Sequence, residues 1–230
     1  MVTRPTVTNA VCTVRSNHVE IEGGYQNTSY PSAGNTVVYP QAVIRVGTAI
    51  HGLEFQVTPP QYQRTTVNTG GTAISGTADA GAALKYIIGY TPKFNYGVQV
   101  GWTAPTGSAA FSAGATQSLY AAQFGYTLSP VFSLFGGVQD QILATGGVNY
   151  GSFVPSLGVS AGLPNGLGLF GEVAEFTHAL GPATPTRTQY ILGANHAVGA
   201  RMQVDLEAGW SPTVTTGKYN YVGFGFGYYF

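Results

Sequence analysis

Charged residues are scarce in this chain of 230 residues. They make up 8% of it, and nine basic and nine acidic side chains cancel to a net charge of zero. A soluble domain usually carries about 25% charged residues, so this low share excludes an ordinary water-facing surface. The even balance gives no reason to expect a nucleic-acid partner or attraction to an anionic membrane surface.

Long apolar runs and cysteines are also lacking. No window approaches the ~20 consecutive apolar residues that a membrane helix needs, and the mean hydropathy is only +0.10. The single cysteine, Cys12, excludes an internal disulfide and is too little for a metal cluster. No group of His, Cys or carboxylate residues has the spacing of a metal site, so we predict neither a metal nor another cofactor.

Glycine and aromatic residues are abundant instead, with 33 Gly, 15 Tyr and 12 Phe. A chain that is poor in charge and has no apolar blocks can still cross a membrane if apolar and polar residues alternate. One face of a closed β-sheet then lies in lipid, and the other surrounds a polar interior. The composition therefore favours a transmembrane β-barrel.

Residues 219–230 show this alternation most clearly. Their even positions hold Val222, Phe224, Phe226, Tyr228 and Phe230, with glycines at 223, 225 and 227 between them. One face of this strand is apolar and aromatic, and the other is nearly bare. A terminal Phe after alternating aromatics resembles the C-terminal strand of bacterial outer-membrane barrels.

The same period of two continues upstream and predicts twelve strands. We expect an all-β fold, a transmembrane antiparallel up-and-down β-barrel of about twelve strands over residues 18–230. Ten or fourteen strands stay open, because the boundaries are uncertain by about 2–4 residues. The expected strands lie near 18–26, 41–46, 53–58, 79–88, 96–103, 117–128, 131–142, 152–162, 167–177, 188–197, 202–210 and 219–230.

The predicted connections alternate in length, as in outer-membrane barrels with short periplasmic turns and longer outer loops. We expect long loops at about 27–36, 59–76, 104–115, 143–150, 178–187 and 211–218, and short turns at 49–52, 91–95, 129–130, 163–166 and 198–201. An even strand count puts both termini on the periplasmic side. Residues 1–17 are expected to be extended, either in the periplasm or folded inward as a plug. They hold no apolar signal segment, so we expect a signal peptide to have been removed.

A soluble β-sandwich or lipocalin-like barrel is the rival fold. It would explain the alternation, but it would need a charged exterior. The charges on the predicted strands mostly fall on the face opposite the aromatics, with Asp140, Glu175 and His196 as outward exceptions. Asp140 and Glu175 lie near outer strand ends, where a lipid-facing charge costs only ~0–1 kcal/mol.

The lumen is where function would lie, and acids outnumber bases among its predicted residues. One interpretation is a weakly cation-favouring or amphiphile-tolerant passage, and the other is that the charges pair across strands to hold the interior together. Arg45 and Glu54 are expected to face each other across the second hairpin. The candidates for lining the lumen are Glu20, Glu22, Gln41, Arg45, Glu54, Gln56, Asp79, Lys85, Gln99, Gln123, Glu172, Asp205 and Glu207, and the same parity adds His18, Gln26, Gln189 and Asn195.

An enzyme is the second class to consider, because twelve-stranded outer-membrane phospholipases carry a His–Ser pair on the lipid-facing wall. None of the four histidines has a matching neighbourhood; His178, beside Thr177, comes nearest. The glycines at 223, 225 and 227 do not form a phosphate loop, since no helix follows them. We therefore predict no catalytic residues.

Several stretches together resemble the outer-membrane barrel family known as "MetA-pathway of phenol degradation", a family of proposed transporters. The resemblance covers nearly the whole chain. It rests on Arg4-Pro5 with residues 18–25, on 40–47 with 52–55, on 75–86, on 104–107 with 111–112, on 169–172 and on the ending 225–230. It implies a barrel that passes small, often hydrophobic or aromatic compounds. The chain departs from the family in its few charges and sparse Asp-rich turns, which argues against a busy hydrophilic pore.

Two functions follow as hypotheses. The first is an outer-membrane channel or transporter that passes small molecules, including hydrophobic or aromatic compounds, through the lumen, with outer-membrane lipids and small solutes as its partners. The alternative is a structural or assembly barrel, closed to traffic, that binds partners or further copies of itself through its loops or outer wall. Twelve strands lie between the filled eight-stranded barrel and the open porins of 16–18 strands, so what fills the lumen decides between them.

Overall fold

The computed structural model describes residues 6–8, 10–31, 33–68, 70–178, 181–212 and 218–230. No helix among these residues is long and apolar enough to cross a membrane. The elements are β1 (Val19–Tyr30), β2 (Gly34–Tyr39), β3 (Val43–Gly47), β4 (Leu53–Thr58), β5 (Tyr62–Val67), β6 (Ala73–Thr77), β7 (Ala80–Tyr90), β8 (Phe94–Ala104), β9 (Gln117–Thr127), β10 (Phe132–Thr145), β11 (Val148–Gly162), the short 3-10 helix η1 (Pro164–Gly166), β12 (Leu167–Phe176), β13 (Arg187–Val198), β14 (Met202–Ser211) and β15 (Tyr219–Tyr229).

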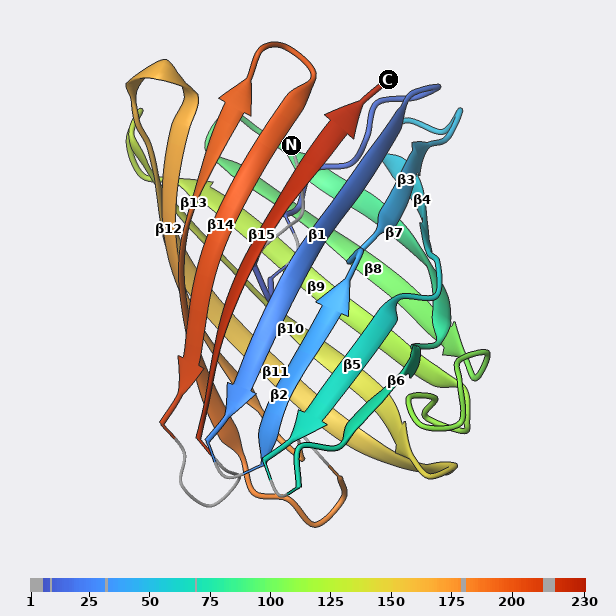
Figure 1. Cartoon of the computed structure of the whole chain (residues 1–230). Helices are drawn as coiled ribbons and strands as arrows, with labels where there is room; N and C mark the ends of the chain where they lie inside the picture. The colour runs from blue at the N-terminus through green and yellow to red at the C-terminus, as the bar shows by residue number, and fades with distance from the viewer. Residues whose placement is uncertain (1–5, 9, 32, 69, 179–180, 213–217) are drawn as a thin grey trace.

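These segments form a closed antiparallel barrel of twelve strands (Figure 1). Eight of its strands are single elements from β8 to β15, and β1 closes the ring by pairing with β15 from Glu20–Tyr229 to Ser29–Asn220. The other three strands are each made of two segments: β2 with β3, β4 with β5, and β6 with β7. The predicted fold class and strand number are confirmed.

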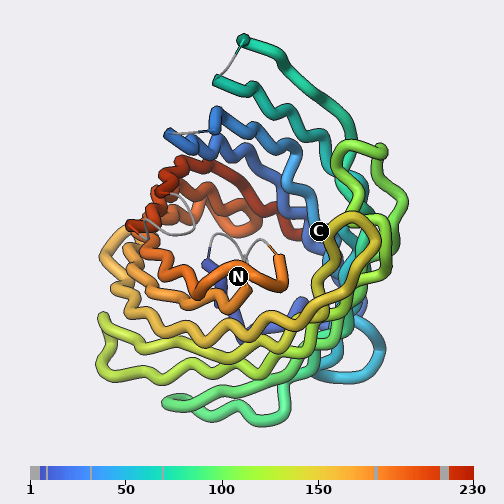
Figure 2. The backbone as a smooth tube through the Cα atoms, turned by 90° about the horizontal axis from the view of Figure 1, so that it is seen from below, coloured from blue at the N-terminus to red at the C-terminus, as the bar shows by residue number. Residues whose placement is uncertain are grey.

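Prolines interrupt two of the three composite strands, and the third breaks opposite one of them. Proline has no N–H to donate to a ladder, and Pro40, Pro59 and Pro60 lie where pairing stops between β2 and β3 and between β4 and β5. The third break, at 78–79, lies opposite the second. Beyond this line β5 and β6 stand off the ring (Figure 2), and among the described residues β6 pairs only with β5.

The predicted loop lengths were wrong at three places. Residues 34–39, 62–67 and 73–77 are strands, where we expected parts of long loops, and the turn between β10 and β11 is only Gly146-Gly147. The two glycines have φ values of +58° and +84°, the left-handed conformation that such a tight hairpin turn requires. Long connections remain between β8 and β9, between β12 and β13 and between β14 and β15, and the strand ends that they join lie at the end opposite the C-terminus. We call this the loop end and the other the turn end.

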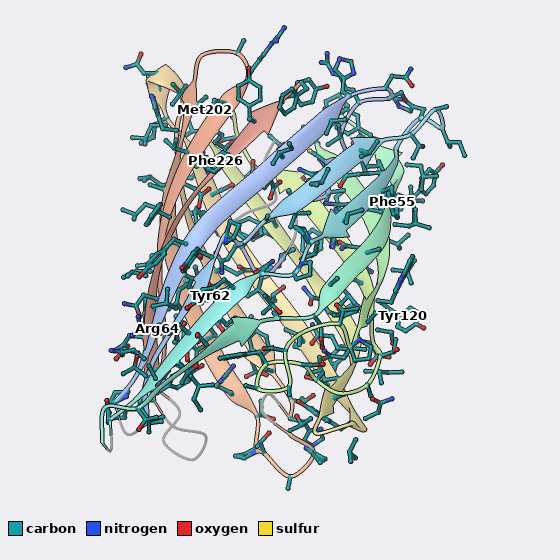
Figure 3. The ribbon with its side chains drawn as sticks, turned by 45° about the vertical axis from the view of Figure 1, so that its right-hand side comes forward. Phe55, Tyr62, Arg64, Tyr120, Met202 and Phe226 are labelled. Atoms are coloured by element: carbon teal, nitrogen blue, oxygen red, sulfur yellow. The ribbon has the colours of Figure 1, made fainter. Side chains whose placement is uncertain are left out.

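The burial pattern is inverted relative to a soluble protein. Most of the buried side chains are polar or charged, whereas large apolar side chains are exposed along every strand from β7 to β15. Tyr120, for example, points away from the wall in Figure 3. Stacked aromatic pairs lie outside toward both ends, such as Tyr190 with Trp210 and Phe94 with Tyr96. This is the surface of a barrel that lies in lipid.

The cost of a lipid-facing charge tests this placement. Leu206, in the middle of β14, is 62% exposed, while Val198 is the last residue of β13. We expect Leu206→Arg to destabilise the barrel by ~2–4 kcal/mol and the control Val198→Arg by ~0–1 kcal/mol, because the cost falls from the bilayer midplane to its interfaces. Urea unfolding in lipid vesicles, followed by heat-modifiable gel migration, measures both. Equal costs at the two sites would contradict a membrane-spanning wall.

Candidate functional site

The interior of the barrel is occupied by the chain's own N-terminal segment. The residues described between 6 and 17, which we call the inner segment, form no strand, and side chains of the barrel wall hold them. Glu172 accepts hydrogen bonds from the backbone N–H groups of Val7 and Thr8, both at 2.7 Å. Gln139 donates to the Val7 carbonyl at 2.8 Å. These contacts fix the beginning of the segment against β10 and β12.

A buried charge cluster holds the rest of the inner segment. Arg45 binds Glu54 through two parallel contacts of 2.8 and 2.9 Å and reaches Glu22 at 2.9 Å and Glu20 at 3.3 Å. Its Nη2, which also binds Glu54, donates to the Cys12 carbonyl at 3.0 Å, and Glu54 also accepts the Val14 N–H at 2.6 Å. Two parallel bonds to one carboxylate are the strongest geometry that a guanidinium offers.

Lys85 belongs to the same cluster. Its ammonium donates to the Ala10 carbonyl, and its neighbour across the ladder is Glu54. Lys85, Arg45, Glu22 and Glu54 are among the most deeply buried side chains of the described chain. Buried charges must be paired or hydrogen-bonded to avoid a large desolvation cost, and here the backbone of the inner segment supplies part of that pairing.

The other predicted lumen residues lie in three settings. Gln56, Gln99 and Gln123 form a hydrogen-bonded row from β4 to β9, which starts at Glu54. Asp205 and Glu207 are buried on β14, away from the cluster. Gln41 is half-buried at the break between β2 and β3 and donates to Gln26 at 2.9 Å.

Asp79 lies apart from Lys85, although the two share a strand face. Its carboxylate accepts the N–H groups of Gly107 and Ala113 at 2.8 and 2.9 Å and so fastens the 105–116 loop to the break between β6 and β7. A cavity of about 490 Å³ lies beside it, lined by Gln63, Phe111 and Gln117 among others. The wall is therefore held at this point by a loop in place of a ladder.

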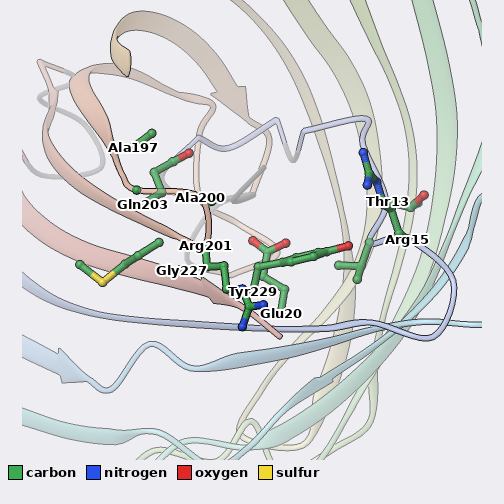
Figure 4. A pocket seen from close by; sticks show the side chains of 12 residues that line it. Thr13, Arg15, Glu20, Ala197, Ala200, Arg201, Gln203, Gly227 and Tyr229 are labelled. Carbon is green, nitrogen blue, oxygen red and sulfur yellow. The ribbon is translucent and has the colours of Figure 1, made fainter. Parts of the chain in front are cut away.

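Cavities lie on both sides of the inner segment. One of about 410 Å³ opens at the turn end and is lined by Thr13, Arg15, Glu20, Arg201 and Tyr229 (Figure 4). Another of about 270 Å³ lies toward the loop end and is lined by Thr6 and Val7 with residues of β1 and β13–β15. The inner segment thus runs between two spaces of the same lumen.

Sequence reasoning missed an aromatic group inside the lumen. Phe170, Ile191, Tyr219 and Tyr221 are buried together, and Val7 of the inner segment packs against them. Parity could have revealed them, because Tyr219 and Tyr221 share the inward face of β15 with Gly223. The alternation of the aromatic even positions in 219–230 drew attention to the opposite face.

Comparisons with known proteins support the fold. No family model and no curated protein sequence matches the chain. Among solved structures it is similar to the COG4313 outer membrane channel from Pseudomonas putida F1, at 15% identity and a TM-score of 0.74, over 98% of this chain and 99% of that one. It is also similar to the NanC porin, at 9% identity and 0.61 over 91% and 98%, and to the CymD monoaromatic hydrocarbon channel, at 11% identity and 0.51 over 94% and 88%.

These likenesses show the fold, which is that of bacterial outer-membrane barrels. The apolar outer wall is that of a barrel embedded in lipid. The resemblance to the phenol-degradation family stays a prediction. Three charged or titratable residues were predicted to point outward, against the general pattern. They are exposed on the outer face: Asp140, Glu175 and His196.

The charge cluster yields a stability prediction. Arg45→Gln leaves Glu20, Glu22 and Glu54 together without their shared partner, so we expect a loss of ~3–5 kcal/mol in the free energy of unfolding. Adding Glu54→Gln removes one of the repelling carboxylates and should recover part of this loss. Gln123→Met, at the uncharged end of the glutamine row, is the control, with an expected loss of ~1 kcal/mol.

Urea unfolding of the four proteins in lipid vesicles measures these differences. An Arg45→Gln protein as stable as the wild type, but with altered ion selectivity, would show that the cluster selects ions and does not hold the barrel together.

Proposed function

We propose that this chain is an outer-membrane channel for small solutes, closed by its own inner segment. The observation that carries the proposal is the position of that segment, between two cavities of one lumen and outside the β-ladder. A structural barrel would gain most from an interior filled by side chains of its own strands. A separate stretch of chain that lies in the lumen and forms no ladder bonds is able to move out of the lumen.

The balance of energies makes such a departure accessible. The inner segment is held by hydrogen bonds to Glu172, Gln139, Arg45, Glu54 and Lys85 and by the burial of Val11 and Val14. A hydrogen bond to a charged group contributes ~1.5–3 kcal/mol net, while ordering one backbone residue costs ~1–2 kcal/mol. The cost of ordering the segment therefore offsets much of what its contacts contribute, which favours its partial release.

The solutes that fit best are small apolar or aromatic compounds. The cavity at the loop end is lined by tyrosine rings and by Ile191. The CymD structure, which has a related fold, is described as a monoaromatic hydrocarbon channel. Small ions would follow the acidic residues Glu172, Asp205 and Glu207, which gives a weak preference for cations.

The break in the wall offers such solutes a second way out of the lumen. Beyond the proline line, β6 has no ladder partner on its outer edge among the described residues, and the neighbouring space is closed by the 105–116 loop. An apolar solute that leaves here would enter the membrane without crossing the charged half of the lumen.

The inner segment is tested by its replacement. Exchanging residues 6–15 for a Gly/Ser stretch of equal length removes the contacts and keeps the chain length, so we expect larger and more frequent single-channel conductance steps in planar bilayers. Glu172→Gln, which weakens only the contacts to Val7 and Thr8, should give an intermediate opening frequency. If all three proteins fold by gel migration yet stay electrically silent, the barrel is closed to traffic and the structural alternative holds.

The opening in the wall is tested by a reversible cross-link. A Cβ at Gly76 would lie 2.9 Å from the Ser108 Cβ, within 1 Å of the spacing in a disulfide. In a Cys12→Ser background, oxidised Gly76→Cys with Ser108→Cys should slow entry of a neutral aromatic such as toluene into vesicles by tenfold or more and leave ion conductance unchanged. Reduction of the same protein is the matched control. Equal toluene entry in both states would contradict the lateral route.

A further inference from the structure

The loop-end cavity contains the cationic side chain of Arg187, and no contact among the described residues of the barrel wall accounts for a positive charge at this place. Arg187 begins β13 and faces inward, and its guanidinium carbon lies 4.6 Å from the centre of the Tyr219 ring and 5.6 Å from that of Phe176. Its Nε is buried and has no hydrogen-bond partner, and no carboxylate of the described residues forms an ion pair with it. Such a buried donor costs free energy unless something binds to it.

The guanidinium carbon lies over the faces of the two aromatic rings, and a ring face offers no oxygen to its N–H groups. These N–H groups lie along the edge of the planar guanidinium, where an acceptor can bind them. A carboxylate matches this edge, because its two oxygens accept two parallel hydrogen bonds. A neutral hydroxyl or a hydrocarbon would leave most of these donors unsatisfied.

The rest of the cavity is suited to an aromatic body. Tyr30, Tyr219 and Tyr221 line it, together with Ile191 and Val7. A chain of hydrogen bonds from Tyr219 to Gln189, from Gln189 to Tyr221 at 3.3 Å and from Tyr221 to Glu207 at 3.2 Å holds the two β15 rings in place. The volume of about 270 Å³ is enough for a single-ring compound.

Glu207 also borders the cavity, and its charge would oppose an anion. It pairs across the ladder with Gly193, six residues beyond Arg187 on β13. At ~3.3 Å per residue, the backbone of Glu207 lies roughly 20 Å deeper along the strand than that of Arg187, although its side chain reaches back toward Tyr221 and Gln189. Its carboxylate moreover accepts the Tyr221 hydroxyl. The two ends of the cavity therefore differ in charge, with the cation nearer the loop end.

We propose that this cavity is a binding site for a small aromatic carboxylate, with the carboxylate on Arg187 and the ring among Tyr219, Tyr221 and Ile191. That this ligand is a transported solute rests on the channel function proposed above. Arg187 lies inside the wall, so phosphate groups of the surrounding lipids are not its ligand. An acidic sugar shares the carboxylate but lacks the apolar ring, so it serves as a comparison ligand.

Equilibrium binding to the full-length barrel tests the site independently of transport. Isothermal titration calorimetry in lipid nanodiscs would compare benzoate with benzyl alcohol and glucuronate. We expect benzoate to bind at least tenfold more tightly than either. Arg187→Gln should abolish the preference for benzoate over benzyl alcohol, and Arg201→Gln, an arginine of the turn-end cavity, should keep it.

A second variant separates the contribution of the aromatic ring to binding from that of the Arg187 charge. A Cβ at Gly209 would lie 2.0 Å from the Tyr221 ring, so Gly209→Ala pushes this ring out of place. We expect Gly209→Ala to weaken the binding of benzoate and of benzyl alcohol by the same factor, whereas Arg187→Gln weakens the binding of benzoate alone. Gel migration shows whether each variant is folded. Benzoate binding no tighter than that of benzyl alcohol, or unchanged by Arg187→Gln in a folded protein, would overturn the proposal.

Vesicle swelling with a small neutral sugar then tests the channel by itself. If vesicles with the protein swell but the protein does not bind benzoate preferentially, the binding site is refuted and the channel function is supported. Preferential benzoate binding by a barrel that passes no solute would support the site and refute its role in transport.

Discussion

The absence of water in the bilayer core is the constraint on which this structure depends. Every backbone N–H and C=O at that depth must find a partner within the protein, and a sheet satisfies all of them only when it closes. The pairing of β1 with β15 achieves this closure. Closure in turn fixes which side chains face lipid and which face the lumen, so the alternation of apolar and polar residues, the low charge and the buried acids have one common cause.

The constraint inside the lumen concerns charges, because charged side chains enclosed by a low-dielectric wall need partners. Arg45 serves three carboxylates at once, and the remaining donors and acceptors of the cluster bind the backbone of the inner segment. The same groups therefore hold both the barrel wall and the inner segment. Release of the segment would expose them to water entering the lumen, which lowers the cost of leaving them unpaired.

The sequence predicted those parts of the structure that depend on local alternation. The fold and the number of strands follow from a period of two, because successive side chains of a pleated strand point to opposite faces. The same parity predicted the lumen-lining set from Glu20 to Glu207, most of which is buried. The breaks at Pro40 and Pro59-Pro60 were taken for loop boundaries, since proline excludes ladder bonding without showing whether pairing resumes beyond it. The contacts of the inner segment and the position of Arg187 beside Tyr219 depend on distant residues, which no local pattern reveals.

The width of the lumen at its aromatic half depends on glycines opposite the rings. Tyr221 lies over Gly209, Phe170 over Gly193 and Phe135 over Gly158, in each case directly across the ladder. A Cβ at any of these glycines would meet the ring at 2.0–2.3 Å. Each ring therefore lies flat against the wall where a side chain would otherwise raise it into the lumen. The interior stays aromatic without being filled, and this is the condition under which a twelve-stranded barrel can hold a ring-shaped solute.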